Sequence, residues 1–288
     1  MQYVTSSPQR EKLARLRQEL GGRLAGINQP GGQPVPAPSL ASSLALGLPL
    51  VDAHLGGGLA RGAVHEIAGT GCDIELATAP AFFASQILLR HADLRAIWIA
   101  AMPDLYGPGL QALELDPARL LLVESRQDAE SLWALEEATR SGAVPLVIGE
   151  IDLLDLTASR RLQLAAEDKN CTILLLRRSR LMGKSDKHRQ PSAATTRWLI
   201  TPRPSAPLAS APVASAPVAN ATRPGLGLPC WHLHLWRQRN GPPAAWDITL
   251  RQDQHWQQIS PAPQRQIRMA ANDDSHSLTL RHHGSSAI

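Results

Sequence analysis

Lysine is scarce in this chain of 288 residues, although its basic residues outnumber its acidic ones. Lysine and arginine together number 29 against 25 aspartate and glutamate residues, which gives a net charge of +4 carried mostly by arginine. The lysines are Lys12, Lys169, Lys184 and Lys187. Positions 13–168 therefore contain none, which excludes any mechanism that needs a lysine ammonium group in that part of the chain.

Long apolar runs and paired cysteines are also missing. Glycine, proline or charged residues interrupt every apolar run well before the roughly 18 residues that a transmembrane helix needs, so we expect no membrane segment. Residues 1–11 lack the apolar stretch of a signal peptide, so we expect a cytoplasmic rather than a secreted protein. Cys72, Cys171 and Cys230 are far apart and lack metal-ligand spacing, which is typical of reduced cytosolic thiols.

Shifts in composition divide the chain into six segments. They are an N-terminal amphipathic helix over 1–27, a Pro/Gly linker over 28–43, a core over 44–201, an Ala/Pro-rich flexible insertion over 202–229, the C-terminal strands of the core over 230–259 and a disordered tail over 260–288. The insertion repeats a five-residue unit as APLAS, APVAS and APVAN, a composition with little capacity to bury a core.

Within the core, short apolar runs alternate with stretches of helical periodicity. We expect strands over 63–68, 95–100, 120–124, 144–149, 171–176 and 195–201, and helices over 76–91, 128–141 and 156–168. Strands that are apolar throughout and joined by helices predict an α/β fold, a mainly parallel sheet with helices on both faces. Alternating residues over 231–237 and 245–251, separated by RNGPP, predict a C-terminal β-hairpin.

A phosphate-binding loop is present in outline between residues 56 and 76. Three glycines, an apolar strand, a second glycine-containing turn and a helix follow one another in the order of such a loop. The residues of the loop itself are Gly69, Thr70, Gly71, Cys72, Asp73, Ile74 and Glu75. It has neither the lysine that binds the β- and γ-phosphates nor the following hydroxyl that binds magnesium, and its two carboxylates repel a nucleotide. We therefore predict a degenerate loop and no nucleotide cofactor.

Two further features bear on nucleotide chemistry. Gly183-Lys184-Ser185 matches the Gly-Lys-Ser/Thr end of a phosphate-binding loop. However, Arg178 stands where the motif needs its first glycine, and no helix start follows, so a basic loop is the favoured interpretation. Glu150 follows an expected strand, at the position where an ATPase carries a magnesium-binding acid, and we interpret it as a degenerate Walker B residue. The carboxylates at this strand end are expected to cap the helix that begins near Leu156.

Residues 177–203 form a basic stretch with a single acid, Asp186. Positive segments bind phosphates without sequence preference, although a solvated loop or a protein-binding surface has the same composition. Only Trp198 lies near, so base stacking is poorly supported. The candidate DNA-contacting residues are Arg177, Arg178, Arg180, Lys184, Lys187 and Arg189. His232 and His234 share one strand face, but without a third ligand they favour a hairpin surface over zinc, so no metal site is expected.

Taken together, these features resemble the RecA-like fold. The chain is most similar to the ImuA family, RecA/SulA-related proteins encoded beside error-prone polymerases in bacteria. The resemblance spans roughly 44–259, interrupted by the Ala/Pro-rich insertion. The motifs that carry it are LPLVD at 48–52, GGGLARGAVHE at 56–66, LDPARL at 115–120, RSGAV at 140–144 and WRQRNGPP at 236–243.

The resemblance implies a cytoplasmic, SOS-induced accessory protein of translesion DNA synthesis, active in DNA repair and mutagenesis after DNA damage. Its implied partners are an ImuB-like inactive polymerase homologue and an error-prone DNA polymerase III alpha-type subunit, with single-stranded DNA as a further candidate. Met102 stands at the position of RecA's catalytic glutamate, with Asp104 close by, and Arg177-Arg178 replace RecA's polar sensor, so we expect a pseudo-ATPase. Two alternatives stay open: an active RecA-like ATPase with an atypical phosphate loop, and a SulA-type inhibitor of the division protein FtsZ.

Overall fold

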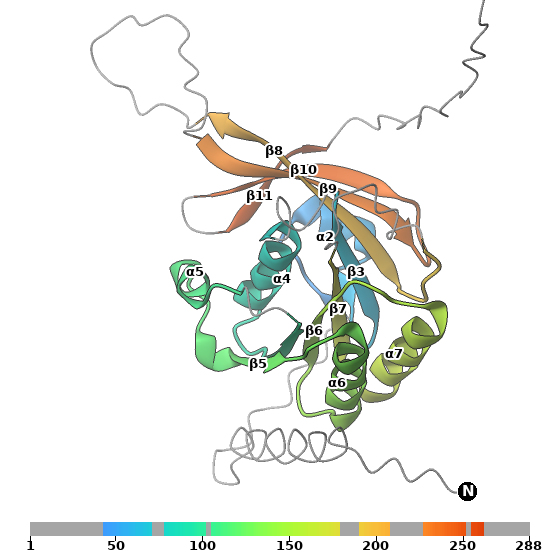
Figure 1. Cartoon of the computed structure of the whole chain (residues 1–288). Coiled ribbons are helices and arrows are strands. Elements are labelled where there is room, and N and C mark those ends of the chain that lie inside the picture. Colours follow the sequence, from blue (N-terminus) through green and yellow to red (C-terminus); the bar gives the residue numbers. More distant parts are fainter. Residues whose placement is uncertain are drawn as a thin grey trace, which may run out of the picture.

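A nine-stranded sheet organises the part of the chain that the computed structural model describes, which comprises residues 43–70, 78–101, 105–178, 190–207, 227–251 and 255–261 (Figure 1). Its strands are β3 (Val64–Gly69), β4 (Ala96–Ala100), β5 (Leu120–Glu124), β6 (Leu146–Ile151), β7 (Thr172–Arg177), β8 (Thr196–Pro207), β9 (Gly227–Gln238), β10 (Ala244–Leu250) and β11 (Trp256–Pro261). They lie in the order β11-β10-β9-β8-β3-β7-β6-β4-β5. Two short strands, β1 (Ser43–Leu44) and β2 (Leu59–Ala60), pair separately.

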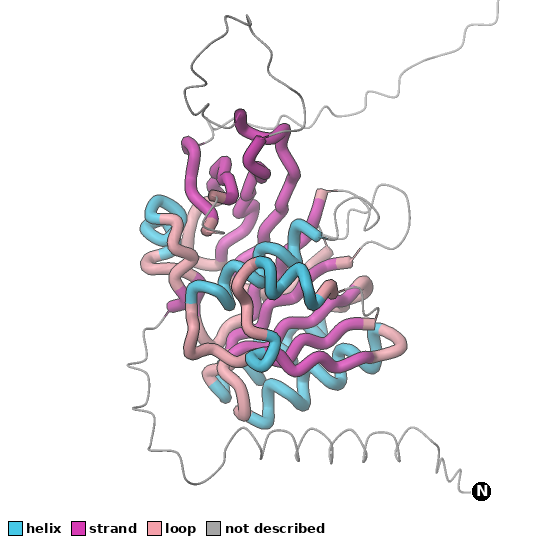
Figure 2. The backbone as a smooth tube through the Cα atoms, turned by 90° about the vertical axis from the view of Figure 1, so that its left-hand side faces the viewer, coloured by secondary structure: helices cyan, strands magenta, loops and turns pink. Residues whose placement is uncertain are grey.

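The strands from β8 to β5 all pair in parallel, whereas β8, β9, β10 and β11 pair with one another antiparallel. The mainly parallel sheet and the hairpin of β9 and β10 confirm the predicted fold class. Both views show that the antiparallel strands extend beyond the helices (Figures 1 and 2). None of the helices within the described ranges is long and apolar enough to cross a membrane.

Helices cover both faces of the parallel part of the sheet. They are α2 (Pro49–Leu55), α4 (Thr78–Arg90), α5 (Gly107–Ala112), α6 (Asp128–Ser141) and α7 (Leu156–Lys169). Because successive strand residues point to opposite faces, β4 places Trp98 in one core with Phe83 of α4 and Ile97 in the other with Leu135 of α6 and Leu162 of α7. This two-sided burial explains why the strands read as continuous apolar runs.

The helix boundaries follow local signals only in part. Helix α6 covers the predicted residues and ends at Gly142, whose φ of 61° is left-handed. Ser125 precedes this helix but does not cap it: it shares a hydroxyl–hydroxyl hydrogen bond of 2.6 Å with Ser131, and the helix begins after Gln127. Of the strand-end carboxylates predicted to cap the next helix, Asp155 does so: its carboxylate accepts a hydrogen bond of 2.7 Å from the backbone N–H of Ala158.

The C-terminal part of the sheet is larger than expected. Strand β8 continues to Pro207 and β9 begins at Gly227, so both enter the proline-rich segment predicted as an insertion. Strand β11 extends to Pro261 and is anchored by Trp256, which is buried and donates a hydrogen bond of 2.6 Å to the carbonyl of Leu46. The predicted helix over 1–27, the linker before Ser43 and the tail beyond residue 261 lie outside the described residues.

Candidate functional site at the carboxyl edge of the sheet

Strands β3, β6 and β7 run in parallel and end at one edge of the sheet, the edge at which strand-to-helix loops bind ligands in α/β folds. Strand β3 leads towards α4, which gives the strand, loop and helix order expected of a phosphate-binding loop. Gly69 ends the strand and Thr70 is exposed. The rest of the predicted loop, Gly71, Cys72, Asp73, Ile74 and Glu75, lies outside the described residues.

Glu150 lies at this edge, near the end of β6, as the sequence predicted. Its side chain is only 4% exposed and is bound from two sides. The indole N–H of Trp98 donates to it at 2.8 Å and the guanidinium of Arg178 at 2.9 Å. The charge of this buried carboxylate is thus paired with a protein cation.

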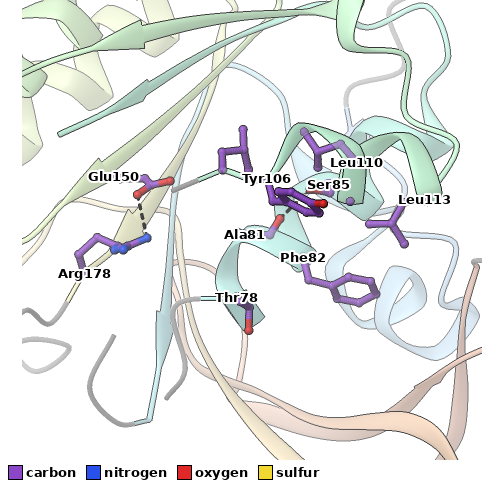
Figure 3. Close-up of a pocket in the computed structure, with 11 residues that line it drawn as sticks. Thr78, Ala81, Phe82, Ser85, Tyr106, Leu110, Leu113, Glu150 and Arg178 are labelled. Carbon is purple, nitrogen blue, oxygen red and sulfur yellow. Dashed lines mark hydrogen bonds and ion pairs between the residues drawn. The ribbon is translucent and has the colours of Figure 1, made fainter. Parts of the chain in front are cut away.

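An open cleft of about 220 Å³ lies beside this ion pair, between α4 and α5 (Figure 3). Its walls are mostly apolar, and Phe82, Leu110 and Leu113 line it together with the 72% exposed Tyr106. Among the described residues that line the cleft, Arg178 is the one cationic side chain, and Figure 3 shows it joined to Glu150. The described part of its lining therefore favours contact with an apolar group.

Two of the predicted DNA-contacting residues are in the protein interior. Arg177 is 5% exposed and Arg178 is 8% exposed. The guanidinium of Arg177 donates to the carbonyl of Asp152 at 3.2 Å and pairs with Glu66 at 3.7 Å. Burial lowers the pKa of Arg177 and the charge of Glu66 opposes that shift. In this arrangement both arginines are structural, which does not agree with their prediction as DNA contacts. Arg180, Lys184, Lys187 and Arg189 lie outside the described residues, as does the tripeptide at 183–185.

A buried network around Glu66 was missed by the sequence prediction. This carboxylate, at the centre of β3, accepts hydrogen bonds from the hydroxyl of Ser192 and from Nε of Arg197 at 3.1 Å, besides its pair with Arg177. It thereby joins Arg177, at the end of β7, to Ser192 and Arg197, which lie later in the same basic stretch. The signal was available in the sequence, because a glutamate inside an apolar strand needs a buried partner.

The other candidate residues that the structure describes are bound to, or packed against, neighbouring side chains. The ring of His232 is hydrogen-bonded to the carboxylate of Asp247 at 2.7 Å, and within the described ranges no group of three metal-binding side chains occurs. Trp198 is buried against Phe83, so it is not available for base stacking. Met102 and Asp104 lie outside the described residues.

The order of the sheet strands, the position of α4 after β3 and the antiparallel extension define a protein of the RecA-like class. The crystal structure of the RadB recombinase matches with a TM-score of 0.53 at 14% identity, covering 75% of this chain and 100% of that chain, which supports the likeness of fold alone. No protein-family model matches the chain.

Sequence relatives identify the family. Protein ImuA of Caulobacter vibrioides, from strain NA1000 / CB15N and from strain ATCC 19089 / CIP 103742 / CB 15, is in each case 35% identical over 238 residues, covering 80% of this chain and 91% of the relative. The chain therefore belongs to the ImuA family, as its motifs predicted.

Proposed function

We propose that this protein is a non-catalytic, RecA-like accessory protein of the mutasome, the DNA damage response system of ImuA proteins. In this role it supports error-prone translesion DNA synthesis through protein contacts and DNA contacts, without nucleotide turnover. Family membership supports the assignment to the mutasome. The ion pair between Arg178 and Glu150 is the observation that favours a non-catalytic role.

Nucleotide hydrolysis on this fold requires a lysine on the phosphates and an acid that holds magnesium at the strand end. No lysine occurs between positions 13 and 168, a range that includes the whole strand–loop–helix unit. The acid at the strand end, Glu150, is bound by Arg178 and Trp98, so a metal ion gains access to it only if a buried ion pair breaks. The lysine is thus absent from this unit, and Arg178 and Trp98 occupy the acid.

Direct measurement of ATP binding tests the non-catalytic role. Labelled ATP is titrated against micromolar protein with magnesium and with EDTA, beside an active RecA-type ATPase as the positive control. We expect no saturable binding and no release of phosphate. Saturable, magnesium-dependent binding with turnover would establish the active-ATPase alternative instead.

Complex formation with the polymerase system tests the accessory role. The purified chain is mixed with an ImuB-like protein and with a polymerase III alpha-type subunit from the same organism, and complexes are separated by size-exclusion chromatography. We expect a stable complex with at least one of them. No complex with either, together with inhibition of the GTPase activity of FtsZ, would support the SulA-type alternative.

The DNA contact of this proposal now depends on the basic residues after Arg178. Replacing Arg180, Lys184, Lys187 and Arg189 by Gln is expected to weaken single-stranded DNA binding and to lower its salt dependence by about 0.7 in log–log slope for each lost phosphate contact. Arg177 and Arg178 are left unchanged, because their replacement alters the protein interior. Equal binding and equal salt slopes for parent and variant would exclude this stretch from DNA contact.

A further inference from the structure

A β-bulge interrupts the pairing of β8 with β9. Arg197 lies opposite Arg237, but the next residue of β8, Trp198, lies opposite Leu235, so Trp236 is an extra residue on β9. Such a bulge breaks the strict alternation of side chains and redirects them locally, and bulges are frequent beside functional sites. Here Trp236 and Arg237 follow one another in sequence, and both contact the network around Glu66.

The contacts of these two residues define their position. The guanidinium of Arg197 lies 4.5 Å from the ring centre of Trp236. The guanidinium of Arg237 donates at 3.2 Å to the carbonyl of Ser192, the residue whose hydroxyl is bound to Glu66. The bulge therefore brings an indole and a cationic group, which are consecutive in sequence, to the network around Glu66.

The indole is supported by a fixed cation. Arg197 is 2% exposed, and it is held by the carboxylate of Glu66 at 3.0 Å and by the carbonyl of Gln190 at 2.9 Å. A cation against the face of a tryptophan ring stabilises the position of the ring. Trp236 itself remains partly exposed, so an aromatic group is presented at the surface on a rigid base.

The exposed charge next to the indole is positive, because Arg237 and Arg239 are both exposed. The described residues 190–207 and 227–251 contain Arg197, Arg203, Arg237, Arg239 and Arg251, and their only acid is Asp247. Asp247 is occupied by His232 at 2.7 Å and by Arg203 at 3.6 Å. Arg239 pairs with Glu167 at 3.5 Å, but both side chains are more than 40% exposed, so water and salt weaken this pair.

We propose that Trp236, Arg237 and Arg239 form a contact site for single-stranded DNA, with the indole stacking on a base and the two arginines binding phosphates. This combination of an aromatic ring and flanking cations recognises single strands without sequence preference, because every base has a π-face that a duplex conceals. The inference rests on the proposed function, for which it supplies a DNA-contacting surface separate from the stretch at 179–189.

Fluorescence anisotropy of a labelled dT20 oligonucleotide, measured at several NaCl concentrations, tests the site. Trp236→Leu keeps an apolar side chain but removes the ring, and it is expected to weaken binding about tenfold with an unchanged salt slope. Trp236→Phe is expected to stay within about threefold of the parent, because it keeps a stacking surface. Arg237→Gln with Arg239→Gln is expected to lower the salt slope by about 1.4.

Arg140→Gln serves as the matched charge control, because Arg140 is 61% exposed in the last turn of α6. It is expected to leave affinity and salt slope unchanged. Urea denaturation of every variant verifies that it is folded at the assay temperature.

Four results would overturn the site. The first two are parent-like binding by the folded Trp236→Leu variant and an equal loss of affinity with Trp236→Phe. The others are an unchanged salt slope in the double arginine variant, and equal competition by duplex DNA or polyglutamate, because such competition would show that binding needs charge alone. If binding depends on Arg180, Lys184, Lys187 and Arg189 but not on Trp236, this site falls while the DNA contact of the proposed function stands. If the parent binds no DNA but still binds the ImuB-like protein, the accessory role survives without this site.

Discussion

Arg178 and Glu150 form an ion pair of 2.9 Å in the interior of the protein, with side chains that are 9% and 4% exposed. The two residues lie at the carboxyl ends of adjacent parallel strands, where a nucleotide-hydrolysing relative of this fold holds magnesium. The chain thus places its own cation against the acid at this edge. The indole of Trp98 completes the arrangement by donating to the other carboxylate oxygen.

Breaking this pair from the arginine side is expected to be costly. Arg178→Met leaves a buried carboxylate without its cation and should lower the free energy of unfolding by about 3–5 kcal/mol. Adding Glu150→Gln removes the orphaned charge and keeps an acceptor for Trp98, so the double variant should recover most of this loss. A double-mutant cycle in urea measures the coupling, and a loss below about 1 kcal/mol for Arg178→Met would contradict a buried, charged pair.

A second prediction concerns Glu66, which is shared by two buried arginines. Glu66→Gln removes the negative charge between Arg177 and Arg197 while preserving the size of the side chain. We expect a loss of at least about 3 kcal/mol in the free energy of unfolding, because two like charges then remain buried side by side. Glu124→Gln, at an exposed position of β5, is the matched control and should change stability by less than about 0.5 kcal/mol. Similar losses for the two variants would show that Glu66 carries no structural charge.

The sequence predicted the helices and strands better than it predicted which side chains pair with one another. Apolar strands alternating with helices identify the parallel sheet, because burial on both faces requires such strands. The pairing of Glu66 with Arg197 depends instead on β3 lying beside β8, a neighbour 131 residues away in sequence. Local patterns contain no information on strand order, so Arg177 and Arg178 were predicted as DNA contacts rather than as internal partners.

The C-terminal strands illustrate a similar limit. Pro202 has a low intrinsic preference for strands, yet it pairs opposite Trp231, because the neighbouring strand and the aromatic core stabilise the extended chain. Trp256 anchors β11 through one distant carbonyl, that of Leu46. Neither contact follows from periodicity. The segment 202–229, which was expected to be flexible, contributes the end of β8 and the start of β9 to the sheet.

A third prediction concerns the stability effects of Gly56 and Gly58, two of the three glycines that precede β3. Gly58 has a φ of +125°, and a Cβ atom placed there would lie 2.2 Å from the carbonyl oxygen of Leu44. Gly56 has a φ of +76° and open space around it. Gly58→Ala should therefore destabilise the protein by at least about 3 kcal/mol and Gly56→Ala by only about 1 kcal/mol. Thermal and urea unfolding measure both, and equal effects would mean that the contact with β1 relaxes freely.

The last prediction follows from His65, which is fully buried between β2 and β8. Its Nε2 bonds to the carbonyl of Ala60 at 2.9 Å and therefore carries the proton, because a carbonyl oxygen only accepts. Its Nδ1 accepts from the hydroxyl of Thr196 at 2.7 Å. Burial lowers the pKa of His65 from 6.5 to about 4, so the folded state holds the ring neutral.

Between pH 6.5 and pH 4 the unfolded chain therefore binds a proton at this histidine that the folded protein does not bind. The stability associated with His65 is fully present above pH 6.5 and is lost as the pH falls, by roughly 3 kcal/mol in total. His65→Gln keeps a donor for Ala60 but does not titrate, so its stability should lack this component of the pH dependence. Urea denaturation of parent and variant at intervals from pH 7.5 to pH 4.5 measures the difference. Parallel stability profiles over that range would show that His65 is protonated equally in the folded and unfolded states.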